Sequence, residues 1–124
     1  MGGESNFSAI APPVFDVDNY QMWAVRMETY LEALDLWEAV EEDYEVPPLP
    51  AKPTITQIKV QKEKKTRKSK AKACLFAATF QMIFMRIMFL KTAKEIWDYL
   101  KVEYEGDERI RGMKVLNLIR DFEL

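Results

Sequence analysis

Hydrophobic residues recur at spacings of three and four in the segment that starts at Thr92. The stripe consists of Ala93, Ile96, Trp97, Leu100 and Tyr104. This spacing predicts an amphipathic helix that buries one face. Thr92 and Glu95 have the spacing of a capping box, and Gly106 stands where a helix often ends in a left-handed residue.

A second stripe lies near the beginning of the chain and predicts another helix. Its members are Tyr20, Trp23, Met27, Tyr30, Leu31 and Leu34. We expect Asp18 to cap this helix, with Gln21 closing the cap from inside. Asp35 and Glu38 repeat the capping pattern, which predicts a short helix that carries Leu36, Trp37 and Val40.

The segment that follows these two predicted helices is first acidic, over residues 41–45, and then rich in proline, over residues 46–53. Glu41, Glu42, Asp43 and Glu45 are expected to form a solvated loop, with a cation site as the alternative. Residues 46–53 contain four prolines, which exclude a helix or an inner strand and favour extended polyproline II geometry. We interpret residues 46–53 as a stiff hinge, with an SH3-type ligand as the alternative.

Residues 54 to about 90 contain neither Gly nor Pro, which predicts one long helix or a helix pair with a break near Ser69. The first part is strongly basic. The candidate RNA contacts are Lys59, Lys62, Lys64, Lys65, Arg67, Lys68, Lys70 and Lys72. Such a cluster can neutralise phosphates without reading sequence, but a solvated helix face is the simpler interpretation, and no aromatic residue is interleaved for base stacking.

The second part, from Ala73 to Leu90, is apolar on almost every side. Phe76, Phe80, Ile83, Ile87 and Leu90 form a stripe suited to the core. Met82, Met85 and Phe89 lie off that stripe and are candidate self-association residues. A membrane span is not expected, because such a span needs about 20 apolar residues and Arg86 interrupts this run.

A last helix is expected after Gly106, with Asp107 as its cap. Its apolar side would carry Ile110, Met113, Leu116 and Ile119. The chain then stops, which we interpret as a truncated helical block.

Composition limits the possible functions. A chain of 124 residues with 48% hydrophobic residues and a net charge of -2 suits one compact domain. No histidine is present, only one cysteine, Cys74, and only four glycines, so the usual nucleophile pairs, most zinc sites and phosphate-binding loops are missing. We therefore expect no enzyme, no metal, no cofactor and no small-molecule substrate. No secretory signal is visible, and an intracellular, cytoplasmic location is expected.

The two aromatic blocks together resemble the Gag protein of plant copia-type LTR retrotransposons. The residues that carry the resemblance are Phe15, Asn19-Tyr20, Trp23, Leu36-Trp37-Glu38-Ala39-Val40, Thr92-Ala93-Lys94-Glu95-Ile96-Trp97-Asp98-Tyr99-Leu100 and Tyr104-Glu105-Gly106. The resemblance covers about residues 13–124 and implies self-assembly into a particle shell around RNA. The Met and Phe residues between positions 81 and 89 depart from the small polar residues common in the family, and the family's zinc knuckle cannot form in this chain.

The sequence as a whole predicts an all-α bundle of about five helices. Its organisation would be a disordered lead over residues 1–12 and a single capsid-like domain over residues 13–124, divided into an aromatic helical unit (13–45), the hinge (46–53) and a long helical block (54–124). The expected structural core is Tyr20, Trp23, Leu34, Trp37, Phe76, Phe80, Ile96, Trp97 and Leu100. The expected function is a self-associating structural Gag-like protein that packages RNA. An RNA-binding module at 59–72 and a domesticated Gag relic serving as a host adaptor or regulator remain alternatives.

Overall fold

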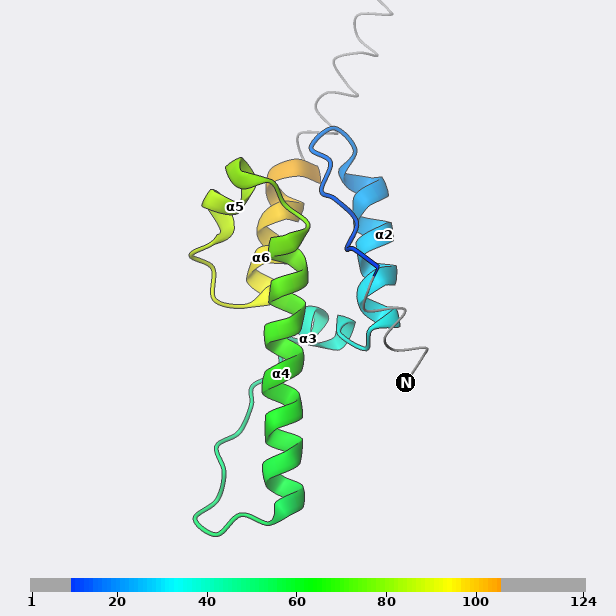
Figure 1. The fold of residues 1–124 in the computed structure, drawn as a ribbon. Helices are drawn as coiled ribbons and strands as arrows, with labels where there is room; N and C mark the ends of the chain where they lie inside the picture. The colour runs from blue at the N-terminus through cyan, green and yellow to red at the C-terminus, as the bar shows by residue number, and fades with distance from the viewer. Residues whose placement is uncertain (1–9, 106–124) are drawn as a thin grey trace, which may run out of the picture.

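The computed structural model describes residues 10–105, which form helices and no strands (Figure 1). The elements are α2 (Tyr20–Ala33), α3 (Trp37–Glu41), α4 (Ile55–Ala77), α5 (Gln81–Ile87), α6 (Ala93–Leu100) and a π-helical turn, η1 (Lys101–Glu105). The predicted all-α architecture is confirmed. Gly106, Asp107 and the expected last helix lie outside the described residues, as do residues 1–9.

The long helix α4 is the central element of the bundle (Figure 1). Its C-terminal half contacts α3 and α6, with α2 and α5 to either side in the view, whereas its N-terminal half extends beyond the other helices beside the Pro-rich segment. α6 contacts both α3 and α4, and η1 follows α6 directly and packs against α2. No helix in the described part of the chain is both long enough and apolar enough to span a membrane.

The core contains apolar side chains from every helix. The largest fully buried side chains are Met27, Leu31, Val40, Leu75, Ile87, Ile96 and Leu100. Tyr20 and Trp23 are buried as predicted, whereas Leu34, Trp37, Phe76 and Trp97 are partly buried and pack against the core. Burial of these stripes against one another is the main stabilising contribution in a small helical bundle.

The three tryptophans form one cluster that joins the first helices to α6. The ring centroid of Trp97 lies 5.3 Å from that of Trp23 and 5.0 Å from that of Trp37. Phe15 extends this cluster, because its ring lies 4.8 Å from Trp23 and 5.0 Å from Tyr104. Segments that are distant in the sequence are therefore held together by tilted and edge-on aromatic contacts, which are stronger than area alone predicts.

Of the three predicted helix caps that fall within residues 10–105, two are wrong in detail. Asn19, and not Asp18, caps α2, since its side-chain oxygen accepts a hydrogen bond from the Met22 backbone N–H at 3.4 Å. Leu36 precedes α3 without any side-chain cap, because Asp35 adopts a left-handed conformation (φ 61°) and its carboxylate pairs with Arg67. Both corrections have the same cause: an Asp or Asn side chain can serve several local partners, and tertiary geometry selects among them.

The predicted cap of α6 is confirmed for Thr92, whereas Glu95 accepts from a different backbone N–H than in a capping box. The Thr92 hydroxyl accepts a hydrogen bond from the Glu95 backbone N–H at 3.1 Å. The Glu95 carboxylate reaches back one residue further than a capping box requires and accepts from the Lys91 backbone N–H at 2.8 Å. The negative charge of Glu95 in the first turn also suits the positive end of the helix dipole.

The break in the long helical block is at residues 78–80, and the predicted break near Ser69 is wrong. α4 runs through Ser69 without interruption. At the true break, the Phe15 backbone N–H donates to the Ala78 carbonyl at 2.7 Å, which occupies an acceptor that a continued helix would need. The Thr79 side chain and backbone both donate to the Phe76 carbonyl, which closes the end of α4.

This break also explains why the expected core position of Phe80 is wrong. Phe80 adopts an extended conformation as the residue before α5, and 70% of its surface is exposed. The predicted stripe assumed one continuous helix through residues 76–90. Because the chain changes direction at Phe80, that side chain leaves the face on which Ile83 and Ile87 pack.

The Pro-rich segment is non-helical as predicted, and it lies against α4. The Gln61 side-chain amide donates to the Pro47 carbonyl at 3.1 Å, and the Tyr44 hydroxyl donates to the Lys64 carbonyl at 3.3 Å. An apolar cavity of about 270 Å³ lies between the prolines and α4, where Leu49 and Val60 are among its lining residues. The segment is therefore tethered to α4 by hydrogen bonds at both Tyr44 and Pro47.

Candidate functional site

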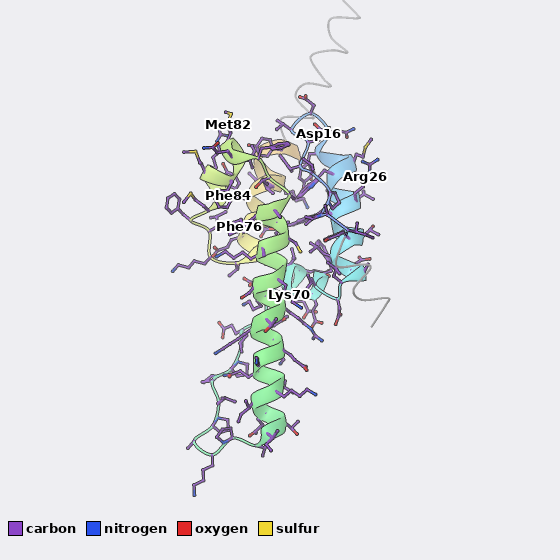
Figure 2. All side chains as sticks on the ribbon, in the orientation of Figure 1. Asp16, Arg26, Lys70, Phe76, Met82 and Phe84 are labelled. Atoms are coloured by element: carbon purple, nitrogen blue, oxygen red, sulfur yellow. The ribbon has the colours of Figure 1, made fainter. Side chains whose placement is uncertain are left out.

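A cluster of exposed apolar side chains surrounds α5. We call it the α5 patch; it consists of Phe80, Met82, Met85, Met88 and Phe89. Met82 is 76% exposed and Phe89 is 79% exposed, and Figure 2 shows Met82 on the outer side of α5. Single exposed apolar residues are common, but five within ten positions, on α5 and directly beside its ends, are typical of an interaction surface.

The inner side of α5 holds the patch in place. Ile87 is fully buried, and the ring of Phe84 packs edge-on against Phe76 with centroids 5.1 Å apart. Arg86 lies near η1, with its guanidinium 3.5 Å from the Tyr104 hydroxyl. The nearby Tyr104 hydroxyl raises the pKa of Arg86, so the guanidinium stays charged at the edge of the patch. The outer side chains of α5 can therefore meet a partner without any loss of core packing.

The eight candidate RNA contacts on α4 divide into two groups. Arg67 forms an ion pair with Asp35 at 3.2 Å, and Lys68 forms one with Asp43 at 3.4 Å. Lys72 lies over the Phe76 ring, 5.5 Å from its centroid. No ion pair within residues 10–105 involves the remaining members, which are Lys59, Lys62, Lys64, Lys65 and Lys70. Arg67 and Lys68 thus have structural partners, whereas Lys59, Lys62, Lys64, Lys65 and Lys70 have no ion-pair partner among residues 10–105 and could meet an external anion.

Lys68 is the centre of a polar network that sequence reasoning missed. Its ammonium donates to the Tyr44 carbonyl at 2.7 Å and lies 5.7 Å from the centroid of the Tyr44 ring. The Oδ1 atom of Asp43 faces the Lys68 ammonium and is buried without an aligned hydrogen bond. The Oδ2 atom of Asp43 accepts a hydrogen bond from the Thr92 hydroxyl at 3.3 Å. Asp43 is therefore an exception in the acidic connector that was predicted to be a solvated loop. The network joins that connector to α4 and to the start of α6.

A shallow hollow lies on the solvent side of α4. It has a volume of about 370 Å³ and is lined by Lys65, Thr66, Ser69, Lys70 and Ala73. Figure 2 places Lys70 near the middle of α4. Two ammonium groups beside two hydroxyl groups can hold a phosphate, because all four groups can donate hydrogen bonds to its oxygens.

Cys74 and the carboxylates do not form a recognisable catalytic or metal site. Burial raises the pKa of the Cys74 thiol, which keeps it protonated and unreactive at neutral pH. Within residues 10–105, no three Cys, Asp or Glu side chains lie close enough together to hold a metal ion. The surface features of α4 and α5 are therefore the candidate functional sites of the described part of the chain.

Sequence reasoning located part of these sites. The exposure of Met82, Met85 and Phe89 was expected from their positions off the core stripe. Phe80 and Met88 belong to the same patch and were missed, because their exposure depends on the break before α5. The Asp43 and Lys68 pair is separated by 24 intervening residues and leaves no local signal that a sequence pattern could show.

Comparison with known protein families adds independent information. A family model described as the gag-polypeptide of LTR copia-type matches residues 27–124, which is most of the chain. The match includes α4, α5 and α6, and with them the α5 patch and the basic residues. No curated protein and no solved structure matches the chain.

Proposed function

The chain belongs to the gag-polypeptide family of copia-type LTR elements, and from this premise we propose that it self-associates through the α5 patch into capsid-like particles that package RNA. Gag domains of this kind are generally structural and non-enzymatic. The mechanism we propose is therefore one of contact surfaces between copies.

The observation that carries the proposal is the exposure of the α5 patch. Its side chains are aromatic or methionine, the types enriched at protein interfaces. Met side chains are flexible and polarizable, so they can adapt to a facing surface of irregular shape. Burying a Phe or Met side chain contributes about 1.5–3 kcal/mol, so a second copy that covers the patch gains a large driving force.

The test substitutes Met85→Ser and Phe89→Ser together in the full chain. We expect self-association to weaken by at least about a hundredfold, since two buried apolar side chains are lost from the interface. Sedimentation velocity over a range of concentrations measures the mass, and far-ultraviolet circular dichroism checks that the helices remain.

The matched control carries Val14→Ser and Val102→Ser, two exposed apolar residues outside the α5 patch. This control should associate like the unchanged protein. The proposal is wrong if the Met85 and Phe89 variant keeps its helices and sediments with undiminished mass.

RNA packaging requires a surface that binds anions, and we propose the hollow on α4 as this surface. Lys65 and Lys70 border the hollow and make no ion pair within residues 10–105. Contact with RNA phosphates releases condensed counterions, so binding should weaken steeply as salt rises.

The RNA contact is tested with Lys65→Glu and Lys70→Glu. Binding to a single-stranded RNA homopolymer should fall at low salt, and the slope of log affinity against log salt should become shallower by about 1.4, or about 0.7 for each lost phosphate contact. Lys91→Glu with Lys101→Glu makes the same change in net charge elsewhere and serves as the control. Equal RNA affinity in the two double variants would remove the hollow as an RNA site.

A further inference from the structure

The charges of the described chain are divided between two parts of the fold. Residues 10–45, which contain α2 and α3, carry ten carboxylates and a single basic residue, Arg26. Residues 46–77, which contain the Pro-rich segment and α4, carry nine basic residues and a single carboxylate, Glu63. At neutral pH the protein therefore has a negative part and a positive part that are complementary to each other.

Within one copy, the ion pairs between the two parts that fall in residues 10–105 lie near the middle of α4, where the Tyr44 hydroxyl also donates to the Lys64 carbonyl. These are the ion pairs of Arg67 with Asp35 and of Lys68 with Asp43. The N-terminal half of α4 extends past α2 and α3 (Figure 1), so its lysines have no acidic helix beside them. Lys59 and Lys62 on α4, and Glu28 and Glu32 on α2, make no ion pair in the part of the chain that the structure describes.

The extended half of α4 presents a mixed apolar and basic surface, which we call the arm face. It consists of Ile55, Ile58, Lys59 and Lys62, whose spacings of three and four place them on one side of the helix. All four are exposed, and Ile55 is 86% exposed. The Pro-rich segment covers a different side of α4, where Thr56, Gln57, Val60, Gln61 and Lys64 line the shared cavity.

The outer side of α2 presents a mixed apolar and acidic surface, which we call the α2 outer face. It consists of Met22, Val25, Glu28 and Glu32, again at spacings of three and four. Met22 and Val25 are exposed, and the core side of the same helix carries Trp23, Met27 and Leu31. The two faces therefore combine apolar residues with charges of opposite sign.

We propose that the arm face of one copy docks on the α2 outer face of a second copy. This inference rests on the proposed self-association and assigns it a second contact. A protein partner is favoured over RNA because RNA phosphates would engage Lys59 and Lys62 but would leave Ile55 and Ile58 in water, and α4 contains no aromatic residue before Phe76 on which a base could stack.

The contact joins two different surfaces, so it repeats from head to tail and produces a ring or an open chain of copies. In Figure 1, α5 and α2 lie on opposite sides of α4, and the N-terminal half of α4 extends away from both. One copy can therefore use the arm contact and the α5 patch at the same time. Exposed ion pairs are individually weak, so the arm contact should be strongly sensitive to salt.

The experiment uses the nuclease-treated full chain that carries Met85→Ser and Phe89→Ser, so that the α5 patch does not contribute. Sedimentation equilibrium at about 50 mM and about 500 mM salt should show association that is lost at the higher salt. Lys59→Glu with Lys62→Glu, and separately Glu28→Lys with Glu32→Lys, should each weaken it by about tenfold or more, because two attractive pairs become repulsive.

The two charge-reversed proteins provide an internal rescue. Mixed together they should associate again, because the acidic arm of one variant meets the basic α2 outer face of the other. The control Lys91→Glu with Lys101→Glu should associate like its parent. The neutral variant Ile55→Ser with Ile58→Ser should also weaken association, and it tests the apolar half of the contact without changing any charge.

Three results would overturn the arm contact: no salt-sensitive association in the nuclease-treated protein, no restoration in the mixture, or an equal loss in the Lys91 and Lys101 control. Each of them leaves the α5 patch untouched, since that patch is judged by comparing the unchanged protein with the Met85 and Phe89 variant at about 500 mM salt, where the arm contact does not contribute. Conversely, if the α5 test failed, restored association in the mixture of the two charge-reversed variants would still support the arm contact.

Discussion

Removal of the Trp97 side chain is the most direct test of how the fold is held together. Trp97 is the middle member of the tryptophan cluster and joins α6 to α2 and to α3 through Trp23 and Trp37. All three tryptophans of the chain belong to this cluster. Trp97→Ala therefore opens a gap between the first helices and α6.

The expected cost follows from the packing. Truncation of a core aromatic costs about 3–5 kcal/mol, and each aromatic pair contributes about 0.5–1.5 kcal/mol beyond its buried area. Trp97 is only partly buried, which places the loss near the lower limit, at about 3 kcal/mol. Small domains have a total stability of about 5–15 kcal/mol, so this one substitution removes a large share of it.

Thermal and urea unfolding followed by far-ultraviolet circular dichroism measure this loss. A decrease of about 3 kcal/mol corresponds to a Tm lower by roughly 10–20 °C for a domain of this size. Near-ultraviolet circular dichroism should also lose intensity, because the two remaining indole rings no longer have Trp97 between them. Val102→Ala is the control: it shortens an exposed apolar side chain outside the proposed contact surfaces and should lower stability by less than about 0.5 kcal/mol. A Trp97→Ala protein that melts cooperatively within a few degrees of the unchanged chain would refute the reasoning.

Three further predictions concern single polar groups. Lys68→Met leaves Asp43 Oδ1 buried beside no cation, and we expect urea unfolding to show a loss of about 1–3 kcal/mol, whereas Asp43→Asn with Lys68→Met should recover part of it if the charge is the cause. Thr92→Ala removes the cap of α6 and should cost about 1 kcal/mol, with Thr92→Ser close to the original value; equal losses in both variants would contradict a capping role. Burial, with smaller contributions from the Glu105 and Asp98 carboxylates, raises the pKa of Tyr20 to about 12, so its neutral form is stabilised by folding; this contribution is complete below about pH 10 and is lost as pH rises from about 10 to about 12. The difference in stability between the unchanged chain and Tyr20→Phe should therefore change by about 2–3 kcal/mol over that pH window, and a constant difference would show that Tyr20 ionises as freely as in an unfolded chain.

Local sequence signals were reliable where one short segment contains both partners of an interaction. The cap of α6 joins Thr92 to Glu95, three residues apart, and the stripe of α6 buries Ala93, Ile96 and Leu100 as predicted. The capping box of α4, between Thr54 and Gln57, is equally local. Such features need no knowledge of the rest of the fold, since the helix itself brings these positions together.

The errors arose where a distant segment decides the local structure. Ala78 ends α4 because its carbonyl accepts from Phe15, and no pattern within residues 54–90 contains that information. Phe80 lies just after this break, in an extended conformation, and is exposed. Asp35 was expected to cap α3, yet it pairs with Arg67 in α4.

The candidate contact surfaces show the same division. The types and spacings of the residues predicted the exposure of Met82, Met85 and Phe89, because a helix face can be read from its period. Which lysines of the basic segment remain available could not be predicted, since Arg67 and Lys68 acquire partners more than 20 residues away in the sequence. The periodicity of a sequence predicts which face of a helix is buried, but it does not predict which other helix covers that face.

The sequence by itself therefore determined the helical class, the apolar faces, the basic segment and the family resemblance, because each depends on residues within one helix or on an ordered set of short motifs. Only the tertiary structure decided where α4 ends, which cations are already paired and that Phe80 and Met88 are exposed as well. The physical reason is that backbone acceptors and buried charges are satisfied by whichever donor packing brings within about 3 Å, and in this chain several of those donors come from far along the sequence.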